Sequence, residues 1–297
     1  MATLPPRVVF VTRESDYDLL LARHATREQA RFFLDRRGQS LDELEERHRR
    51  QDEALKSARA LVPGDWRQAL VSRGGLDRFL FTPEDIVVAL GQDGLVANVA
   101  KYLAGQPVIG VNPMPELYDG VLVRFPAAEV GKLLAATHAG AVVQQRRTMV
   151  EGRLDSGERL VALNELFVGH RSHQSARYEI AGQDGVEEQS SSGIIIASGT
   201  GATGWARSIM LATGQDVPLS PEERALGWFV REPFPSRATG TKMRSGRLDT
   251  EPLAVTSHMN EGGVIFADGI EQDYLAFDWG RRLHVAVAQQ ALSLVTG

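Results

Sequence analysis

The 297-residue sequence predicts an α/β N-terminal domain followed by a β-rich C-terminal domain. Two apolar strands, Asp85–Leu90 and Pro107–Val111, enclose a helical pattern that begins after Gly94, which is the strand–helix–strand unit of parallel sheets. After Phe125 the pattern changes to short strands separated by turn sequences. We expect three parts: residues 1–125, residues 126–275, and a C-terminal segment, residues 276–297, that packs back on the N-terminal domain.

The first element is a buried strand, Arg7–Thr12, because four apolar residues follow one another within it. A long and highly charged helical region, residues 26–62, comes next and is interrupted at Gly38. Ser40 and Glu43 have the spacing of a capping box, so we expect a helix to begin there.

The charged face of this helix is expected to be solvated surface. Glu45 with Arg49, and Glu46 with Arg50, are four residues apart, which is the spacing of ion pairs on a helix. Each such pair contributes roughly 0.2–0.5 kcal/mol.

The C-terminal half is expected to contain one more helix, Ala127–Ala136, that leads into a series of strands. The expected strands are residues 141–150, 158–168, 177–180, 194–197, 253–256, 264–266 and 282–287.

Composition excludes several classes of protein. The 33 basic residues against 38 acidic ones give a net charge of −5, which argues against binding nucleic acid. With 0 Cys the chain has no disulfide framework, no cysteine zinc site and no thiol nucleophile. No apolar run approaches the roughly 20 residues that cross a bilayer, so no membrane association is expected. We expect a cytoplasmic protein.

Asp93 is the first candidate for chemistry, because it lies in the glycine turn Gly91–Gly94 between a buried strand and a helix. Backbone N–H groups at a helix N-terminus bind anions, and a carboxylate beside them can hold a metal or accept a proton. A structural alternative is equally open: Asp93 caps the helix, and the glycines make the turn.

Asn164 and Glu165 are the second candidate, because they interrupt the apolar run Val161–Val168. Apolar neighbours on both strand faces force at least one of the two side chains inward or to a strand end. An inward charge is costly unless a site pairs or solvates it, which favours a functional role over a bulge or an edge position.

The third candidate is the loop of small and hydroxyl residues that follows the apolar strand at 194–197. Its glycines match the dinucleotide fingerprint G-x-G-x-x-G literally, at positions 199, 201 and 204. That fingerprint also requires an acid at the end of a second strand about 20 residues later. The nearest acid, Asp216, has no apolar strand before it, so a nicotinamide-dependent dehydrogenase is the weakest interpretation.

The hydroxyl groups of this loop are more informative than its glycines. Thr200 and Thr203, with free backbone N–H groups, suit a ribose, an amide or a phosphate. Trp205 follows them and either stacks on a flat ring or belongs to the core.

Together these segments resemble the NAD kinase family, which shares a diphosphate-cradling G-G-D-G turn with diacylglycerol, sphingosine and phosphofructokinases. The matching segments occur in the family order: Gly91–Gly94, Leu163–Glu165 and Thr200–Trp205. The chain is more closely similar to the mitochondrial type of NAD kinase. That similarity rests on Val11–Arg13, Glu46–His48, Ser191–Gly193, Gly199–Gly201, Arg231–Pro233 and Asp268–Gly269.

The resemblance implies a Rossmann-like N-terminal domain of the NAD kinase and diacylglycerol kinase type, a β-rich NAD-binding domain and an active site between them. The implied reaction moves a phosphoryl group from ATP to the 2′-hydroxyl of the adenosine ribose of NAD. Asp93 would act as general base and organise Mg²⁺. A homodimer is also implied. The residues that would bind the nucleotides are Gly91, Gln92, Gly94, Asn164, Glu165, Thr200, Gly201, Thr203 and Trp205.

Two departures from the family pattern keep other functions open. Family members usually carry Gly at the position of Gln92 and Thr at that of Leu95. If position 92 needs a positive φ, a side chain there costs about 1–2 kcal/mol. The alternatives are a catalytically silent dinucleotide-binding or regulatory protein, a kinase that uses inorganic polyphosphate, and a lipid-type kinase with an apolar acceptor pocket.

Overall fold

The computed structural model describes residues 5–183 and 185–297. They divide into two compact units: unit 1 extends to Gln145 and takes back Ser293–Gly297, and unit 2 is Arg146–Leu292. The division therefore falls about 20 residues beyond the expected boundary at 125/126. Helix α5 (Val130–His138) explains the difference, because its apolar residues share the core of the N-terminal strands.

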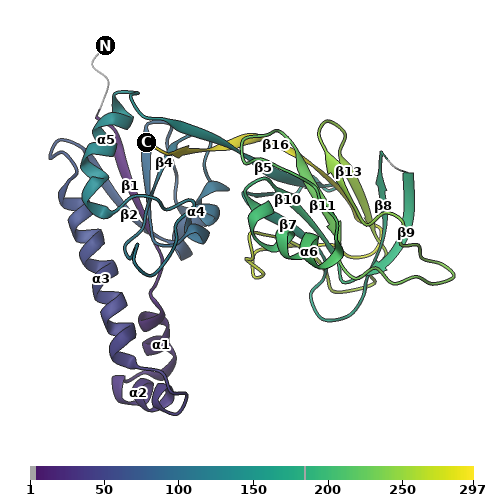
Figure 1. Cartoon of the computed structure of the whole chain (residues 1–297), viewed down its shortest axis with the longest axis horizontal. Coiled ribbons are helices and arrows are strands. Elements are labelled where there is room, and N and C mark those ends of the chain that lie inside the picture. Colours follow the sequence, from purple (N-terminus) through teal and green to yellow (C-terminus); the bar gives the residue numbers. More distant parts are fainter. Residues whose placement is uncertain (1–4, 184) are drawn as a thin grey trace. The chain divides into compact units, whose positions relative to one another are not determined.

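Unit 1 contains a parallel sheet in the order β2-β1-β3-β4, and the end of β16 pairs with β4 through Ser293 and Leu294. Every residue of β3 is buried, as is typical of strands covered on both faces. Helices α3 and α5 cover one face and α4 contacts the strands as well (Figure 1). The elements are β1 (Arg7–Thr12), β2 (Arg67–Ser72), η1 (Arg73–Arg78), β3 (Asp85–Leu90), α4 (Asp93–Ala100), β4 (Pro107–Val111), η2 (Ala127–Glu129) and α5.

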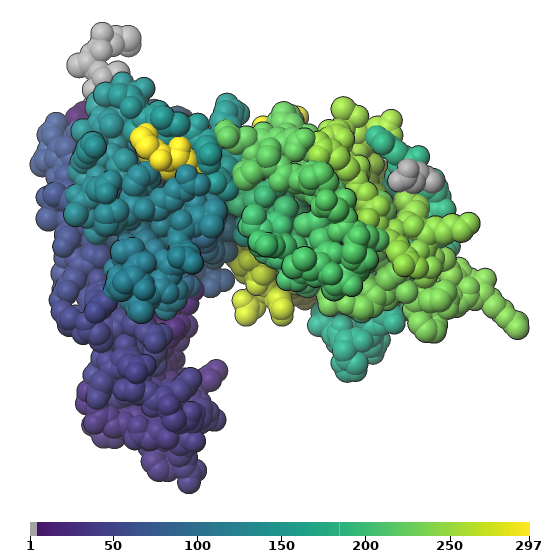
Figure 2. Space-filling view, viewed as in Figure 1, coloured from purple at the N-terminus to yellow at the C-terminus, as the bar shows by residue number. Residues whose placement is uncertain are grey.

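Three helices, α1 (Asp16–His24), α2 (Arg27–Asp35) and α3 (Leu41–Ala60), meet in a small lobe of unit 1 with an apolar cluster of its own. The lobe is the purple part at the lower end of unit 1 in Figure 2. None of the helices in the described ranges is long and apolar enough to cross a membrane.

The expected capping box at Ser40 is wrong. Ser40 precedes α3 with an extended backbone, but its side chain makes no capping hydrogen bond. The box forms instead at α1, where the Ser15 hydroxyl accepts from the Asp18 N–H at 3.1 Å and the Asp18 carboxylate accepts from the Ser15 N–H at 2.9 Å. The sequence spacing at Ser40 permits the box but does not require it.

One of the two expected ion pairs on α3 forms. Arg50 donates to Glu46 at 2.9 Å, as predicted. The prediction of a pair between Glu45 and Arg49 is wrong. Glu45 instead accepts two hydrogen bonds from Arg27, at 2.5 and 2.6 Å, and one from Tyr17. Tertiary partners within the lobe outcompete the helical neighbour.

Unit 2 is built from two packed antiparallel sheets. One has the order β12-β11-β10-β7-β14-β15, and in the other β16, β13, β8 and β9 follow one another, with β5 beside β16 and β6. The strands are β5 (Gln144–Leu154), β6 (Arg159–Ala162), β7 (Glu165–His170), β8 (Ala176–Gly182), β9 (Gly185–Ser191), β10 (Ile194–Ser198), β11 (Leu226–Val230), β12 (Ser245–Leu248), β13 (Leu253–Ser257), β14 (Gly263–Ala267), β15 (Tyr274–Ala276) and β16 (Arg282–Val295).

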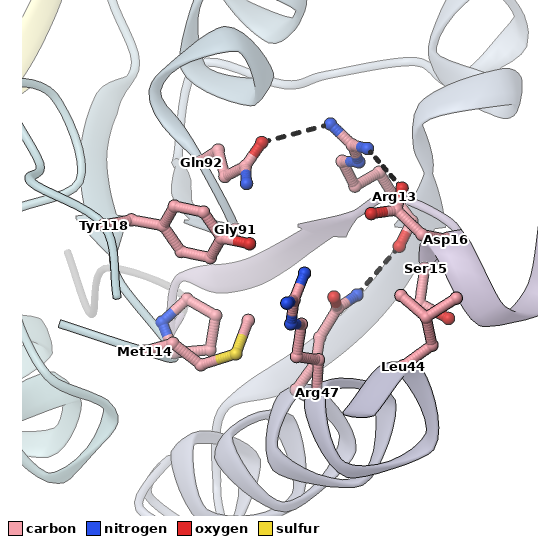
Figure 3. A pocket seen from close by; sticks show the side chains of 11 residues that line it. Arg13, Ser15, Asp16, Leu44, Arg47, Gly91, Gln92, Met114 and Tyr118 are labelled. Atoms are coloured by element: carbon pink, nitrogen blue, oxygen red, sulfur yellow. Dashed lines mark hydrogen bonds and ion pairs between the residues drawn. The ribbon is translucent and has the colours of Figure 1, made fainter. Parts of the chain in front are cut away.

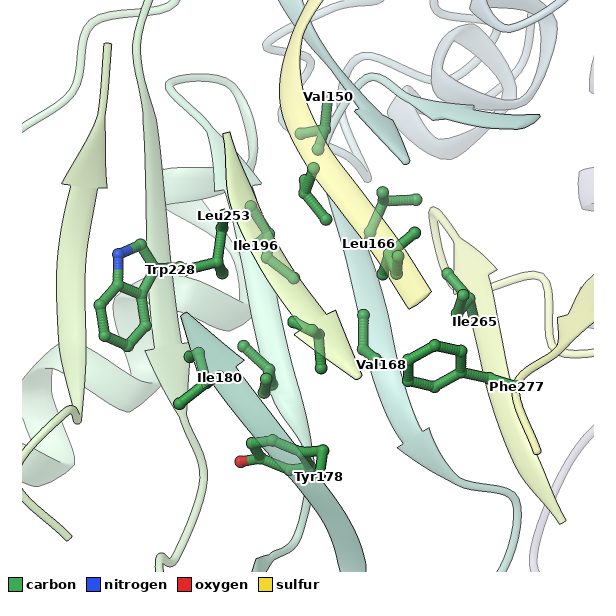
Figure 4. Packing of buried hydrophobic residues seen from close by; sticks show 14 of the residues in the cluster. Val150, Leu166, Val168, Tyr178, Ile180, Ile196, Trp228, Leu253, Ile265 and Phe277 are labelled. Atoms are coloured by element: carbon green, nitrogen blue, oxygen red, sulfur yellow. The ribbon is translucent and has the colours of Figure 1, made fainter. Parts of the chain in front are cut away.

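The core of unit 2 lies between the inner faces of its two sheets (Figure 4). Leu166 and Val168 of β7 and Ile196 of β10 meet Tyr178 and Ile180 of β8 there. Alternate residues of β7 and β10 point to the opposite, outer face, as strand geometry requires. Helix α6 (Trp205–Thr213) covers part of that outer face over Ile195 and Ala197. The rest of the outer face carries the site described below.

Candidate active site

The glycine turn of unit 1 lies between β3 and α4. Gln92 precedes the helix with an extended backbone, φ −103° and ψ 166°. Position 92 therefore needs no positive φ, and the strain considered for a non-glycine residue there does not arise. The Gln92 side chain turns to Arg13, whose Nη1 donates to Gln92 Oε1 at 3.3 Å.

Leu95 also has a structural explanation. It is 2% exposed, and a Cβ built on Gly91 would lie 3.2 Å from Leu95 Cδ2. Leu95 thus packs under the glycine turn. An apolar contact occupies the place where the family usually has a hydroxyl.

Asp93 does not cap its own helix; it clamps a second segment to the turn. Its Oδ1 accepts the N–H groups of Leu122 and Val123 at 2.8 and 3.0 Å, and its Oδ2 accepts that of Val121 at 3.0 Å. The clamped segment reaches β4 because Gly110 has no side chain: a Cβ there would lie 2.0 Å from the Leu122 carbonyl oxygen. Oδ2 takes one hydrogen bond and keeps acceptor capacity for a further donor.

The carboxylate donors that could hold a metal are few. In the parts of the chain that the structure describes, no three His, Cys, Asp or Glu side chains lie together as a metal site. Mg²⁺ is commonly held by one or two carboxylates together with substrate phosphates. Asp93 fits that donor set only in the company of a phosphate.

In unit 2, Asp268 organises the Asn164–Glu165 pair. Its carboxylate accepts the N–H groups of Leu163 at 3.0 Å, Asn164 at 2.7 Å and Glu165 at 3.3 Å. These bonds replace strand pairing, so the single strand expected at 158–168 is wrong: β6 ends at Ala162, and β7 begins at Glu165.

Apart from the family resemblance, the sequence predicts no role for Asp268. Its backbone has φ +50°, and Gly269 follows with φ +70°. The available signal was an Asp-Gly pair directly after a buried strand, which is typical of many turns.

Glu165 is a half-buried acid with an unusual environment. Burial is the larger cause and the charge of Asp268 the smaller one that together raise the pKa of Glu165 to about 7. Among the described residues no side chain forms a hydrogen bond with its carboxylate. A carboxyl group that titrates near neutrality can accept a hydrogen bond when ionised or donate one when protonated.

The hydroxyl loop lies directly against the Asn164–Glu165 pair. The Ser198 hydroxyl donates to the Leu163 carbonyl at 2.5 Å and accepts the N–H groups of Thr200 and Gly201. Gly201 packs so closely that a Cβ would lie 2.2 Å from the Asn164 carbonyl oxygen. The structure thus brings the second and third sequence candidates together in one unit.

The remaining groups of the loop are held in place. Arg147, which is 2% exposed, donates to the Thr200 hydroxyl at 3.3 Å. The Thr203 hydroxyl donates to the Thr200 carbonyl at 3.0 Å. Nothing in the local sequence distinguishes Arg147 from the other arginines of β5, so its role could not be predicted.

The glycines of the loop serve packing. Gly199 lies against Ser220, where a Cβ would be 2.0 Å from the carbonyl oxygen. The strand after α6 is β11, which pairs antiparallel with β10. A dinucleotide fingerprint needs a parallel strand there, so the dehydrogenase interpretation is unsupported.

Trp205 opens onto a cavity of about 520 Å³ on the outer face of the six-stranded sheet. Its ring is stacked on Phe167, with centroids 6.0 Å apart and planes 6° apart, and the Arg231 guanidinium lies 5.1 Å from the ring centre. Two arginines, Arg171 and Arg231, and two histidines, His170 and His173, line the cavity together with the acid Glu271. The cavity therefore combines aromatic walls with an excess of basic groups.

The fold is that of nicotinamide dinucleotide kinases. A yeast NADH kinase solved with NADH aligns with a TM-score of 0.59 and 16% identity, over 99% of this chain and 84% of that one. An NAD kinase from Archaeoglobus fulgidus solved with ATP aligns with a TM-score of 0.59 and 18% identity, over 98% of this chain and 93% of that one.

The sequence is similar to NAD kinases, which confirms the resemblance drawn from the motifs. NAD kinase of Chlorobaculum tepidum is 30% identical over 156 residues, 52% of this chain and 51% of the relative. Mitochondrial NAD kinase 2 of Rattus norvegicus is 28% identical over 265 residues, 72% of this chain and 62% of the relative. The chain thus spans about half to three fifths of these relatives. No family model matches it.

Proposed function

We propose that this protein is an NAD kinase, which transfers the γ-phosphoryl group of ATP to the 2′-hydroxyl of the adenosine ribose of NAD. One observation carries the proposal: Ser198 and Gly201 join the Thr200 loop to the Asn164–Glu165 pair. The sequence similarity to NAD kinases supports the same conclusion.

The residues of unit 2 would hold the dinucleotide. Asn164 and Glu165 offer an amide and a carboxylate to ribose hydroxyl groups, and Thr200 and Thr203 offer backbone and hydroxyl groups. The cavity beside Trp205 has the volume, the aromatic walls and the basic groups that suit one nucleotide half of NAD. The hydroxyl groups of the Thr200–Thr203 loop favour a polar acceptor over the apolar one of a lipid-type kinase.

Asp93 of unit 1 would act as general base. The ribose oxygen forms a bond to the γ-phosphorus while the bond from that phosphorus to the bridging oxygen of ADP breaks. The hydroxyl proton passes to Asp93 Oδ2, which accepts only one backbone N–H. A ribose hydroxyl is a weak acid, so the proton moves late in the reaction. Mg²⁺, when bound with the donor phosphates, supplies charge neutralisation.

Three further expectations belong to this proposal. A homodimer and the separate roles of the two units rest on the family resemblance, and a cytoplasmic location rests on the composition of the sequence. Sedimentation of the purified protein with and without NAD tests the first of them. A monomer under both conditions contradicts it.

The central test is NADP formation from NAD with ATP and with inorganic polyphosphate, assayed side by side. We expect turnover with ATP, and a loss of about 10²–10⁴-fold in kcat in Asp93→Asn, the range typical of a general base. Asp77→Asn is the matched control, because Asp77 is exposed and its ion pair with Arg78 is long, at 3.6 Å.

The remaining outcomes separate the alternatives. Equal turnover in wild type and Asp93→Asn refutes the role of Asp93. Turnover with polyphosphate alone identifies the other donor. Tight NAD binding in calorimetry without turnover from either donor identifies a silent dinucleotide-binding protein.

A further inference from the structure

A second concave site lies in unit 1, in front of the glycine turn, and none of the roles above uses its basic groups. It is formed where the end of β1, helix α3 and the turn at Gly91–Gln92 approach one another (Figure 3). Arg13 follows β1, Arg47 projects from α3, and Tyr118 and Met114 form an apolar wall. The site lies wholly within unit 1.

Its two guanidinium groups have weak partners. Arg13 reaches Asp16 at 3.4 Å, and Arg47 reaches Glu43 at 3.8 Å. The side chains of both acids are more than half exposed, at 60% and 71%. Long ion pairs to exposed acids contribute little, so both guanidinium groups can exchange these partners at small cost.

Two other arginines of unit 1, Arg7 and Arg27, are engaged more tightly. Arg7 donates to Asp85 at 2.6 and 2.8 Å, and Arg27 donates to Glu45 at 2.5 and 2.6 Å. Guanidinium groups in such bidentate pairs already use their N–H donors to hold carboxylates of the protein. Arg13 and Arg47 retain their donor groups for a ligand.

The size and polarity of the site indicate a phosphate. The cavity volume is about 40 Å³, and one water needs roughly 10–15 Å³ of such space. That volume admits a small tetrahedral group, such as one phosphate of a chain. The nearby N-terminus of α4 adds positive potential, since Gln92 leaves the first helical N–H groups without a side-chain cap.

We propose that Arg13 and Arg47 bind the phosphate chain of the phosphoryl donor, as a cationic clamp facing the glycine turn. The proposal rests on the kinase function given above and names the residues that recognise its donor. It also gives Gln92 a role: the amide oxygen that accepts from Arg13 orients that guanidinium toward the site. The shared ligand chemistry is a phosphoanhydride chain, whether it comes from ATP or from inorganic polyphosphate.

Binding of the donor, measured separately from turnover, tests the clamp. Calorimetry with inorganic triphosphate and with ATP is carried out on wild type, Arg13→Gln, Arg47→Gln and Arg49→Gln. Arg49 is the matched control, because it lies on α3 and pairs with Glu46 and Glu53 away from the site. Thermal melting of each variant confirms that it is folded.

We expect about tenfold weaker binding of both probes in each clamp variant, since each loses charge-assisted hydrogen bonds. Arg49→Gln and the affinity of every variant for NAD stay unchanged. Arg13→Lys and Arg47→Lys retain part of the affinity, because each keeps the charge and loses the bidentate geometry. Weaker binding of ATP alone identifies the nucleotide as the donor, and weaker binding of triphosphate alone identifies polyphosphate.

The proposal is overturned if wild type binds neither probe, or if the clamp variants bind both as wild type does. A different result contradicts the kinase function and leaves the clamp intact: wild type makes no NADP, but the clamp variants bind triphosphate more weakly than wild type does.

Discussion

Asp268 Oδ1 accepts the backbone N–H of Asn164 at 2.7 Å, so a carboxylate fixes the position of a residue 104 places away in the sequence. The same carboxylate raises the pKa of Glu165 through its charge, after the larger effect of burial. One acid therefore fixes the backbone of the Asn164–Glu165 pair and adds to the effect of burial on the pKa of Glu165.

Replacing Asp268 will destabilise the protein. Asp268→Ala leaves up to three backbone N–H groups without their acceptor and places Ala at φ +50°, which together cost about 2–4 kcal/mol. Asp268→Asn keeps an acceptor and a residue type that tolerates this backbone, and loses less. Urea unfolding measures both free energies. A loss of unfolding free energy below about 0.5 kcal/mol in Asp268→Ala contradicts a stabilising role for the hydrogen bonds that Asp268 accepts.

The pH dependence of stability will report Glu165. Its pKa is about 7 in the folded protein and 4.5 in the unfolded chain, so folding favours the protonated form. The stabilisation by that proton is complete below about pH 4.5 and is lost as the pH rises through about 7. Glu165→Gln lacks this titration. The difference in free energy of unfolding between the variant and wild type therefore shifts in favour of the variant by up to about 3 kcal/mol from pH 5 to pH 8.

Urea unfolding at pH 5 and pH 8 measures this difference, with the exposed Glu251→Gln as control. If both variants follow wild type at both values of pH, the environment assigned to Glu165 is incorrect.

Gly201 will not tolerate a side chain. A Cβ there would lie 2.2 Å from the Asn164 carbonyl oxygen, so Gly201→Ala must displace the loop from the Asn164–Glu165 pair. We expect a destabilisation of about 1–3 kcal/mol and weaker NAD binding. Gly64→Ala is the control, since its Cβ meets no atom within 4 Å. Normal NAD affinity in a folded Gly201→Ala protein would argue against the joined site.

Trp205 will contribute to dinucleotide affinity. Stacking of a base on an aromatic side chain is worth about 1–3 kcal/mol, so Trp205→Ala is expected to weaken NAD binding by about tenfold or more. Trp205→Phe keeps part of the stacking surface and retains part of the affinity. Trp279→Ala is the control, because Trp279 is 62% exposed and lies outside the lining of the cavity. Equal affinity in all three variants contradicts a role for the aromatic wall.

The order and type of the strongly apolar elements could be predicted from the sequence. Strands β1, β3 and β4 begin and end at the predicted residues, because continuous apolar runs bounded by proline, glycine or charge have few other folded forms. Strand β2 was not predicted, since most of its residues are exposed and show no apolar pattern.

Local signals failed where a distant residue decides the local structure. The break between β6 and β7 depends on Asp268, and the partner of Glu45 depends on the packing of the lobe. The role of Asp93 shows the same limit: spacing placed it at the start of α4, but its bonds to 121–123 follow from the path of the chain beside β4.

The sequence by itself determined the parallel strands of unit 1, the β-rich character of unit 2 and the residues that carry the resemblance to NAD kinases, because apolar periodicity and ordered motifs are local properties. Only the tertiary structure decided that Ser198 joins the Thr200 loop to Asn164, that burial and the smaller effect of the Asp268 charge raise the pKa of Glu165, and that Arg13 and Arg47 line one site before the glycine turn. Hydrogen bonds and desolvation depend on which groups approach each other in space, and these groups lie far apart in the chain.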